Sequence, residues 1–119
     1  MKVLVVGHSP GKVKPEKSIT RKRVFSWLQQ VGVMEFTWHN LVAHHAPKLS
    51  LKQVTLDPQL VKQFDKVVSL GVLASSWLDR QGISHYPAPH PSGLNRQWND
   101  PATEPRVIQQ LKQYIHEDL

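Results

Sequence analysis

The chain has 119 residues, a length typical of one domain with a single hydrophobic core. It contains no cysteine, which excludes disulfides, thiolate metal sites, cysteine nucleophiles and cysteine-ligated iron–sulfur clusters. Its formal net charge of +6 favours a polyanionic partner such as nucleic acid, although charge alone fits equally well a basic surface with no partner.

The first apolar run, residues 3–6, predicts a strand buried on both faces and closed by Gly7. It is too short for the core of a signal peptide or for a membrane span, so we expect a soluble, cytoplasmic protein that has no membrane partner. A basic segment follows this run and favours phosphate binding. Its cationic residues are Lys12, Lys14, Lys17, Arg21, Lys22 and Arg23.

Apolar residues at helical spacing follow Ser18 and Thr20, either of which can cap a helix that ends at Gly32. Residues 35–40 alternate well enough for a second strand, and a weaker helix is expected over residues 58–64. The residues expected on the core face of the first helix are Val24, Phe25, Leu28 and Val31.

The second half of the chain continues the alternation, with strands expected at residues 66–70 and 83–86. A helix between these strands ends at Gly82, and another covers residues 105–119. The order predicts one α/β domain over residues 1–119, a three-layer α/β/α fold around a mainly parallel four-stranded sheet. The helix between the two strands buries Leu73, Trp77 and Leu78, and the last helix buries Val107, Ile108, Leu111 and Ile115.

Ligands of such sheets bind at the carboxyl ends of the strands, where this chain places its unusual polar residues. After the first strand comes GHSPGK, which lacks the glycine spacing and the Ser or Thr of a phosphate-binding P-loop. A tight turn explains its glycines and prolines but not His8 and Ser9. These two residues are therefore candidates for chemistry.

Asn40 ends the second strand, where its amide offers a donor and an acceptor side by side, the pattern that reads a base edge. A loop-capping asparagine is the plainer alternative. The adjacent His44 and His45 suggest metal, but no carboxylate is spaced to join them, so we expect no metal site.

The stretch APHPSGLNR follows the fourth strand, and its prolines stiffen the backbone on both sides of His90. An imidazole held there can donate to developing negative charge. Ser92 and the backbone near Gly93 can grip a phosphate, while Leu94 and Arg96 suit an apolar wedge and a stacking cation. A wedge combined with a phosphate grip is what base flipping requires. A rigid loop with Leu94 in the core is the alternative.

Together these three loops resemble the uracil-DNA glycosylase superfamily. GHSPG resembles its first motif, Asn40 falls where several branches pair with the uracil edge, and HPSGLNR resembles its last motif. The last loop is closest to the mismatch-specific branch and is also similar in short phage-encoded members. The matching residues of the first and last motifs are Gly7, His8, Ser9, Pro10, Gly11, His90, Pro91, Ser92, Gly93, Leu94, Asn95 and Arg96.

The resemblance implies hydrolysis of an N-glycosidic bond in DNA that carries uracil or a related modified pyrimidine, without metal or organic cofactor. His90 would donate to O2 of the departing base, and Ser9 or His8 would position water. The first motif would contact the substrate beside Asn40 and Ser92. The residues expected to contact DNA are Lys12, Lys14, Arg21, Gly93, Leu94, Asn95 and Arg96.

Two departures leave other functions open. Family members usually carry aspartate or asparagine where this chain has Ser9, which brings no negative charge, and the aromatic residue that stacks on the base has no clear match besides Phe25, Trp27 or Trp38. A catalytically weak or inactive member could bind DNA or a modified base without excision. A small α/β domain that binds a free nucleotide or a protein is a third possibility, and it predicts weak salt dependence.

Overall fold

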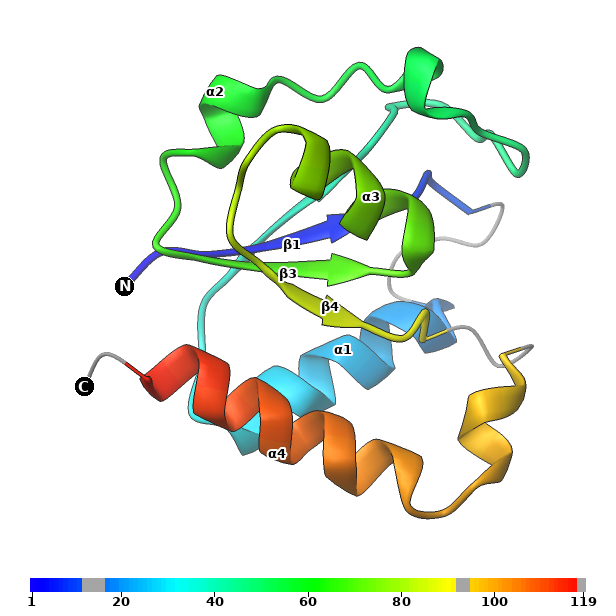
Figure 1. The fold of residues 1–119 in the computed structure, drawn as a ribbon. Helices are drawn as coiled ribbons and strands as arrows, with labels where there is room; N and C mark the ends of the chain where they lie inside the picture. The colour runs from blue at the N-terminus through cyan, green and yellow to red at the C-terminus, as the bar shows by residue number, and fades with distance from the viewer. Residues whose placement is uncertain (12–16, 92–94, 118–119) are drawn as a thin grey trace.

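A computed structural model describes residues 1–11, 17–91 and 95–117. Four parallel strands form one sheet with helices on both of its faces (Figure 1), which confirms the predicted α/β class. In chain order the elements are β1 (Val3–Gly7), α1 (Ile19–Gln30), β2 (Thr37–Asn40), η2 (Leu51–Gln53), α2 (Pro58–Val61), β3 (Lys66–Leu70), α3 (Val72–Arg80), β4 (Tyr86–Ala88), η3 (Arg96–Asn99) and α4 (Thr103–His116).

The strand order is β2-β1-β3-β4, so β1 and β3 lie at the centre of the sheet. Both central strands are buried along their whole length. The continuous β-branched and leucine sequence of β1 predicts this burial, whereas β3 also buries the polar residues Lys66 and Ser69. Helix α1 connects β1 to β2 on one side, and the chain then returns past β1 to form β3. The strand order therefore reverses between β1 and β3, the place where open α/β sheets bind ligands.

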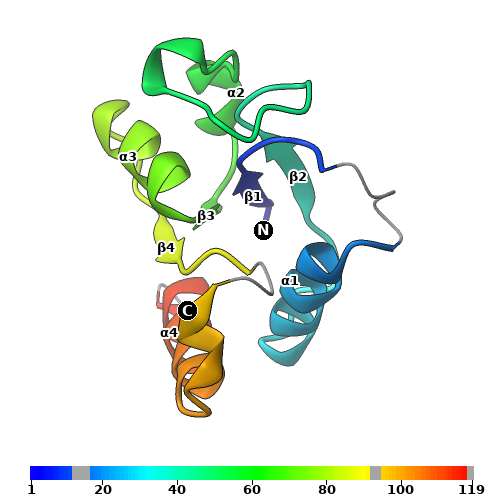
Figure 2. The ribbon, with the colours of Figure 1, turned by 90° about the vertical axis from the view of Figure 1, so that its right-hand side faces the viewer.

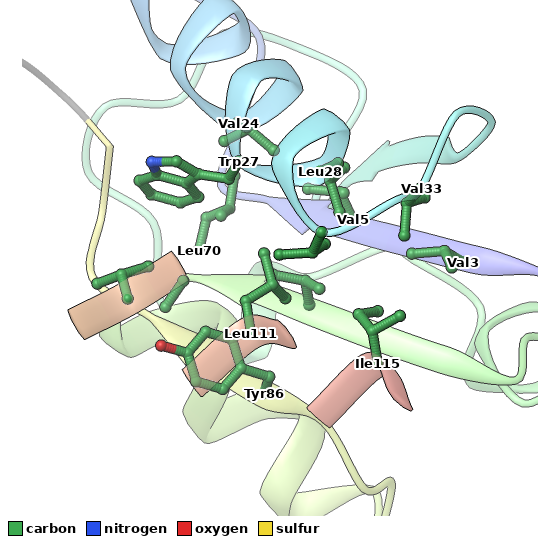
Figure 3. Packing of buried hydrophobic residues seen from close by; sticks show 14 residues of the cluster. Val3, Val5, Val24, Trp27, Leu28, Val33, Leu70, Tyr86, Leu111 and Ile115 are labelled. Atoms are coloured by element: carbon green, nitrogen blue, oxygen red, sulfur yellow. The ribbon is translucent and has the colours of Figure 1, made fainter. Parts of the chain in front are cut away.

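Alternate residues of β1 enter two separate hydrophobic clusters. Val3 and Val5 join a cluster with α1 and α4, whereas Leu4 and Val6 join one with α2 and α3. Figures 1 and 2 show these helix pairs on opposite sides of the sheet. Figure 3 shows the first cluster, in which Trp27 of α1 packs near the strands and α4.

Helix α1 begins where the sequence predicts, because the Ser18 hydroxyl accepts a hydrogen bond from the Arg21 backbone N–H at 3.2 Å. The prediction that Phe25 belongs to the core is wrong, since 47% of it is exposed and Trp27 is fully buried instead. Trp27 shares one helix face with Val24 and Leu28 at the i, i+3, i+4 spacing, and Phe25 falls outside that face.

The fourth strand is shifted from the predicted residues 83–86 to Tyr86–Ala88. Ile83 belongs to the turn that ends α3, where its N–H donates to the Leu78 carbonyl, and Gly82 has a φ of +69°. Tyr86 and Ala88 are buried and pair with β3 in parallel register. Pro87 is tolerated between them because β4 is an edge strand.

The other boundaries differ by a few residues. Strand β2 starts at Thr37 because its pairing with β1 begins at Leu4, and α2 is a single turn that ends at Val61. The last helix runs from Thr103 to His116. Among the described residues, no helix has both the length and the apolar sequence needed to cross a membrane.

Candidate functional site

The carboxyl ends of the strands meet at one edge of the sheet, which faces the viewer in Figure 2. Residues 8–11 after β1, residues 89–91 after β4 and the start of α1 also lie at this edge (Figures 1 and 2). Gly7 and Asn40 are register partners at the ends of β1 and β2. The described residues of all three sequence motifs therefore share one edge, which we call the carboxyl rim.

The loop after β1 is tied to the segment after β2 through Ser9. The Ser9 hydroxyl donates to the Ala46 carbonyl at 3.2 Å and accepts from the Ala46 N–H at 3.3 Å. His45 Nδ1 donates to the Pro10 carbonyl at 2.8 Å, since a carbonyl oxygen can only accept. These contacts hold the GHSPG turn, and they give His45 a structural role.

His8 is partly buried, and its Nδ1 lies 3.2 Å from the Ser9 hydroxyl. The single hydroxyl proton of Ser9 is directed to Ala46, so the His8 bond is satisfied when Nδ1 carries the imidazole proton. Nε2 of His8 is then unprotonated and able to accept a proton. Ser9 thereby sets the tautomer of His8, and its own hydrogen-bonding capacity is taken up by the protein.

Asn40 lies beside Gly7 on the adjacent strand, and its amide is held by Trp38 of its own strand. The indole N–H of Trp38 donates to Asn40 Oδ1 at 3.0 Å. A Cβ atom on Gly7 would lie 2.5 Å from that oxygen, so this approach requires glycine. The guanidinium of Arg21 stacks over the Trp38 ring at 4.5 Å and joins α1 to this end of the sheet.

His90 is half-buried against the end of β3. A Cβ atom on Gly71, which follows β3, would lie 3.2 Å from His90 Cδ2, and Gly71 has a φ of +87°. The His90 carbonyl accepts from Asn95 Nδ2 at 2.9 Å and from the Trp98 indole N–H at 3.0 Å. The loop is therefore shaped around His90 by side chains as well as by its prolines.

Arg23 of α1 joins this loop to the rest of the domain. Its Nη1 donates to the Pro91 carbonyl at 3.3 Å, and its guanidinium stacks over the Trp98 ring at 4.7 Å. An ion pair of 3.5 Å to Glu104 connects it to α4 as well. The basic segment of the chain thus supplies a structural residue in addition to candidate phosphate contacts.

Burial affects both imidazoles of the rim. Burial lowers the pKa of His8. The pKa of His90 is lowered first by burial and then by the charge of His8. Both histidines are consequently neutral at pH 7, the state in which each ring has one donor and one acceptor nitrogen.

The predicted DNA-contacting residues are placed as follows. Arg21 and Arg96 lie at the starts of α1 and η3, and Arg96 is exposed. Asn95 Oδ1 accepts from the Gln97 backbone N–H and Nδ2 donates to the His90 carbonyl, so this side chain helps to hold the loop. The predicted residues Lys12, Lys14, Ser92, Gly93 and Leu94 lie outside the described residues.

Several residues that complete the rim have no clear signal in the sequence. Ala46 acts through its backbone, and Gly71 is one of six glycines with nothing to mark it. Trp98 stands close to the last motif, so proximity alone could have suggested its role. In residues 1–11, 17–91 and 95–117, no group of three or more histidine, aspartate or glutamate side chains could hold a metal ion.

Comparisons of this chain with models of known protein families, with curated proteins and with solved structures find no match.

Proposed function

We propose that the protein is a DNA glycosylase that flips uracil or a related modified pyrimidine out of DNA and hydrolyses its N-glycosidic bond. The observation that carries the proposal is that His8 follows β1, Asn40 ends β2 and His90 follows β4, so residues far apart in the sequence lie at the same end of the parallel sheet. Their order along the chain follows the three motifs of the uracil-DNA glycosylase resemblance. The rim also lies where the strand order reverses.

His90 is suited to stabilise the departing base. Its ring is neutral at pH 7 because burial lowers its pKa, and a neutral imidazole still carries one N–H donor. That donor would face the base O2, where negative charge develops as the bond between C1′ and N1 breaks. Contacts of Asn95, Trp98 and Arg23 to the loop reduce the motion of the ring before reaction.

His8 is the better of the two candidates for activating water. The hydroxyl of Ser9 is engaged with Ala46, whereas His8 Nε2 is left as an acceptor. Water would attack C1′, its proton would pass to Nε2, and the electrons of the broken bond would leave with the base. The proton on His8 would then be available to the departing base.

Base and backbone recognition would use the remaining groups of the rim. Asn40 would pair with the edge of the flipped base, and Arg21 and Arg96 would meet phosphates. Leu94 would fill the gap in the stack and Ser92 would grip a phosphate, as the resemblance implies.

A second candidate function is a binding module that recognises the same base without excising it. It is favoured by Ser9, which places a neutral side chain where the resemblance expects a charge-stabilising or water-orienting one. This module would keep the base contact of Asn40 and the phosphate contacts. It would lack only the chemical step.

The test uses labelled oligonucleotides with uracil opposite guanine, opposite adenine or in a single strand, followed by alkaline cleavage of abasic sites. We expect strand breaks with the wild type and their loss in His90→Ala. The matched control is His44→Ala, an exposed histidine of the loop after β2, which should retain activity. Salt-sensitive binding of intact uracil DNA without breaks would support the binding module instead.

A further inference from the structure

Trp38 and Asn40 are two residues apart on β2, so their side chains project from the same face of the sheet. The Trp38 indole N–H is a donor and never an acceptor. At 3.0 Å from Asn40 it therefore requires the amide oxygen, and rotating the amide by 180° would bring its NH₂ group against the indole N–H. The contact thus fixes which end of the amide carries the donors.

The surroundings keep this pair in place. Gly7 lies beneath it, since an added Cβ would approach Asn40 Oδ1 to 2.5 Å and Trp38 Nε1 to 2.9 Å. Arg21 covers the Trp38 ring at 4.5 Å and limits movement of the indole. The amide NH₂ of Asn40 has no hydrogen-bond partner within residues 1–11, 17–91 and 95–117, so its donors are available to a ligand.

This orientation matters because uracil and cytosine present reversed patterns to an asparagine. Uracil offers a donor at N3 and an acceptor at O4, whereas cytosine offers an acceptor at N3 and donors at N4. An asparagine that can turn over pairs with either base. An asparagine held in one orientation pairs with one of the two bases. With the other base it places donor against donor and acceptor against acceptor.

We propose that Trp38 is a specificity-determining positioning residue, which locks the Asn40 amide so that the rim accepts the uracil edge and rejects the cytosine edge. The inference rests on the proposed function, which supplies uracil as the ligand of Asn40. It goes beyond that function because it assigns the discrimination against cytosine to a tryptophan that need not touch the base.

The test compares single-stranded oligonucleotides that are identical except for one deoxyuridine or one deoxycytidine. Affinities are measured by fluorescence anisotropy for the wild type and for Trp38→Phe, which keeps a ring beneath Arg21 but removes the indole N–H. Trp77→Phe is the matched control, because Trp77 is buried in α3 on the opposite face of the sheet.

We expect the wild type to prefer deoxyuridine and Trp38→Phe to lose up to about tenfold of that preference, the value of one hydrogen bond. Trp77→Phe should keep the preference. If the role of Trp38 is merely structural, Trp38→Phe will bind both oligonucleotides equally more weakly. An unchanged ratio of the two affinities in Trp38→Phe would overturn the inference while leaving the proposed function intact. A wild type without any preference would contradict the proposed function itself.

A second measurement needs no variant and so does not depend on the folding of Trp38→Phe. By NMR of the wild type, the indole hydrogen of Trp38 should exchange with solvent more slowly than an unprotected indole hydrogen, because it is bound to Asn40. Exchange at the unprotected rate would show that Trp38 does not hold the Asn40 amide and would overturn the inference.

Discussion

Replacing Gly7 with alanine should lower the rate of uracil release about 100-fold at a modest cost in stability. Gly7 ends β1 without a positive φ, so its backbone conformation is open to alanine. The new methyl carbon would lie 2.5 Å from Asn40 Oδ1, which must retreat by about 0.9 Å to reach the 3.4 Å of an ordinary contact. A displacement of about 1 Å in a positioned group lowers rates by about 100-fold.

The cost in stability should fall in the overpacking range of about 1–3 kcal/mol, because the methyl group displaces the end of Asn40 and also approaches Trp38 Nε1 to 2.9 Å. The lower entropy of the unfolded alanine chain offsets part of it, by about 0.4–1 kcal/mol. For a chain of this length 1 kcal/mol corresponds to about 4 °C in Tm.

Gly32→Ala provides the control. Gly32 has a φ of +88° and nothing within 4 Å of an added Cβ, so alanine there costs about 1 kcal/mol through the backbone alone. Uracil release under single turnover and thermal unfolding by circular dichroism are measured for both variants. Full activity in Gly7→Ala, or an equal loss in Gly32→Ala, would refute the close packing of Asn40 on Gly7 as the cause.

Three further predictions concern charge and packing. Burial lowers the pKa of His8 and His90 below the ordinary value of 6.5, and His8 lowers that of His90 further, so below about pH 6.5 the unfolded chain binds more protons. The free energy of unfolding should be highest above that pH and fall as the pH drops below it. Urea titrations should show a smaller fall in a variant with glutamine in place of both His8 and His90. An equal fall in that variant would contradict the role of the two histidines. Trp27→Phe should change the free energy of unfolding by no more than about 1 kcal/mol, because the lost contacts are offset by removal of a buried indole N–H that has no hydrogen-bond partner in the described part of the chain. A loss as large as that expected for Trp27→Ala, about 3–5 kcal/mol, would show that the indole N–H is hydrogen-bonded. Arg21→Gln should reduce the slope of log affinity for DNA against log salt by about 1, and an unchanged slope would exclude a phosphate contact at Arg21.

Short-range patterns predicted most of the fold. The buried strand at residues 3–6 is recognisable because a continuous run of apolar residues closed by glycine has few other uses, and the strand at residues 66–70 is marked by its adjacent valines, Leu70 and the following Gly71. The parallel sheet then follows from alternation, and the carboxyl rim follows from the sheet. The error at β4 arose because Ile83 looks like a strand residue, although a glycine turn holds it to the end of α3.

The interior of the candidate site was less predictable, because its contacts join distant parts of the chain. Ser9 reaches Ala46 across 37 residues, and Arg23 reaches the Pro91 carbonyl across 68 residues. No periodicity encodes such pairs, and backbone partners leave no trace in residue type. The sequence pointed to the candidate residues for chemistry but not to the residues that hold them in place, apart from the stiffening prolines around His90.

The most direct test of the central claim is to detect the free base itself. Excess protein is mixed with a single-stranded oligonucleotide that carries one deoxyuridine, and released uracil is quantified by mass spectrometry alongside the intact abasic strand. We predict one free uracil per oligonucleotide for the wild type and none for His90→Ala. If uracil stays attached to DNA that the wild-type protein binds, cleavage of the N-glycosidic bond is contradicted and the rim serves recognition alone.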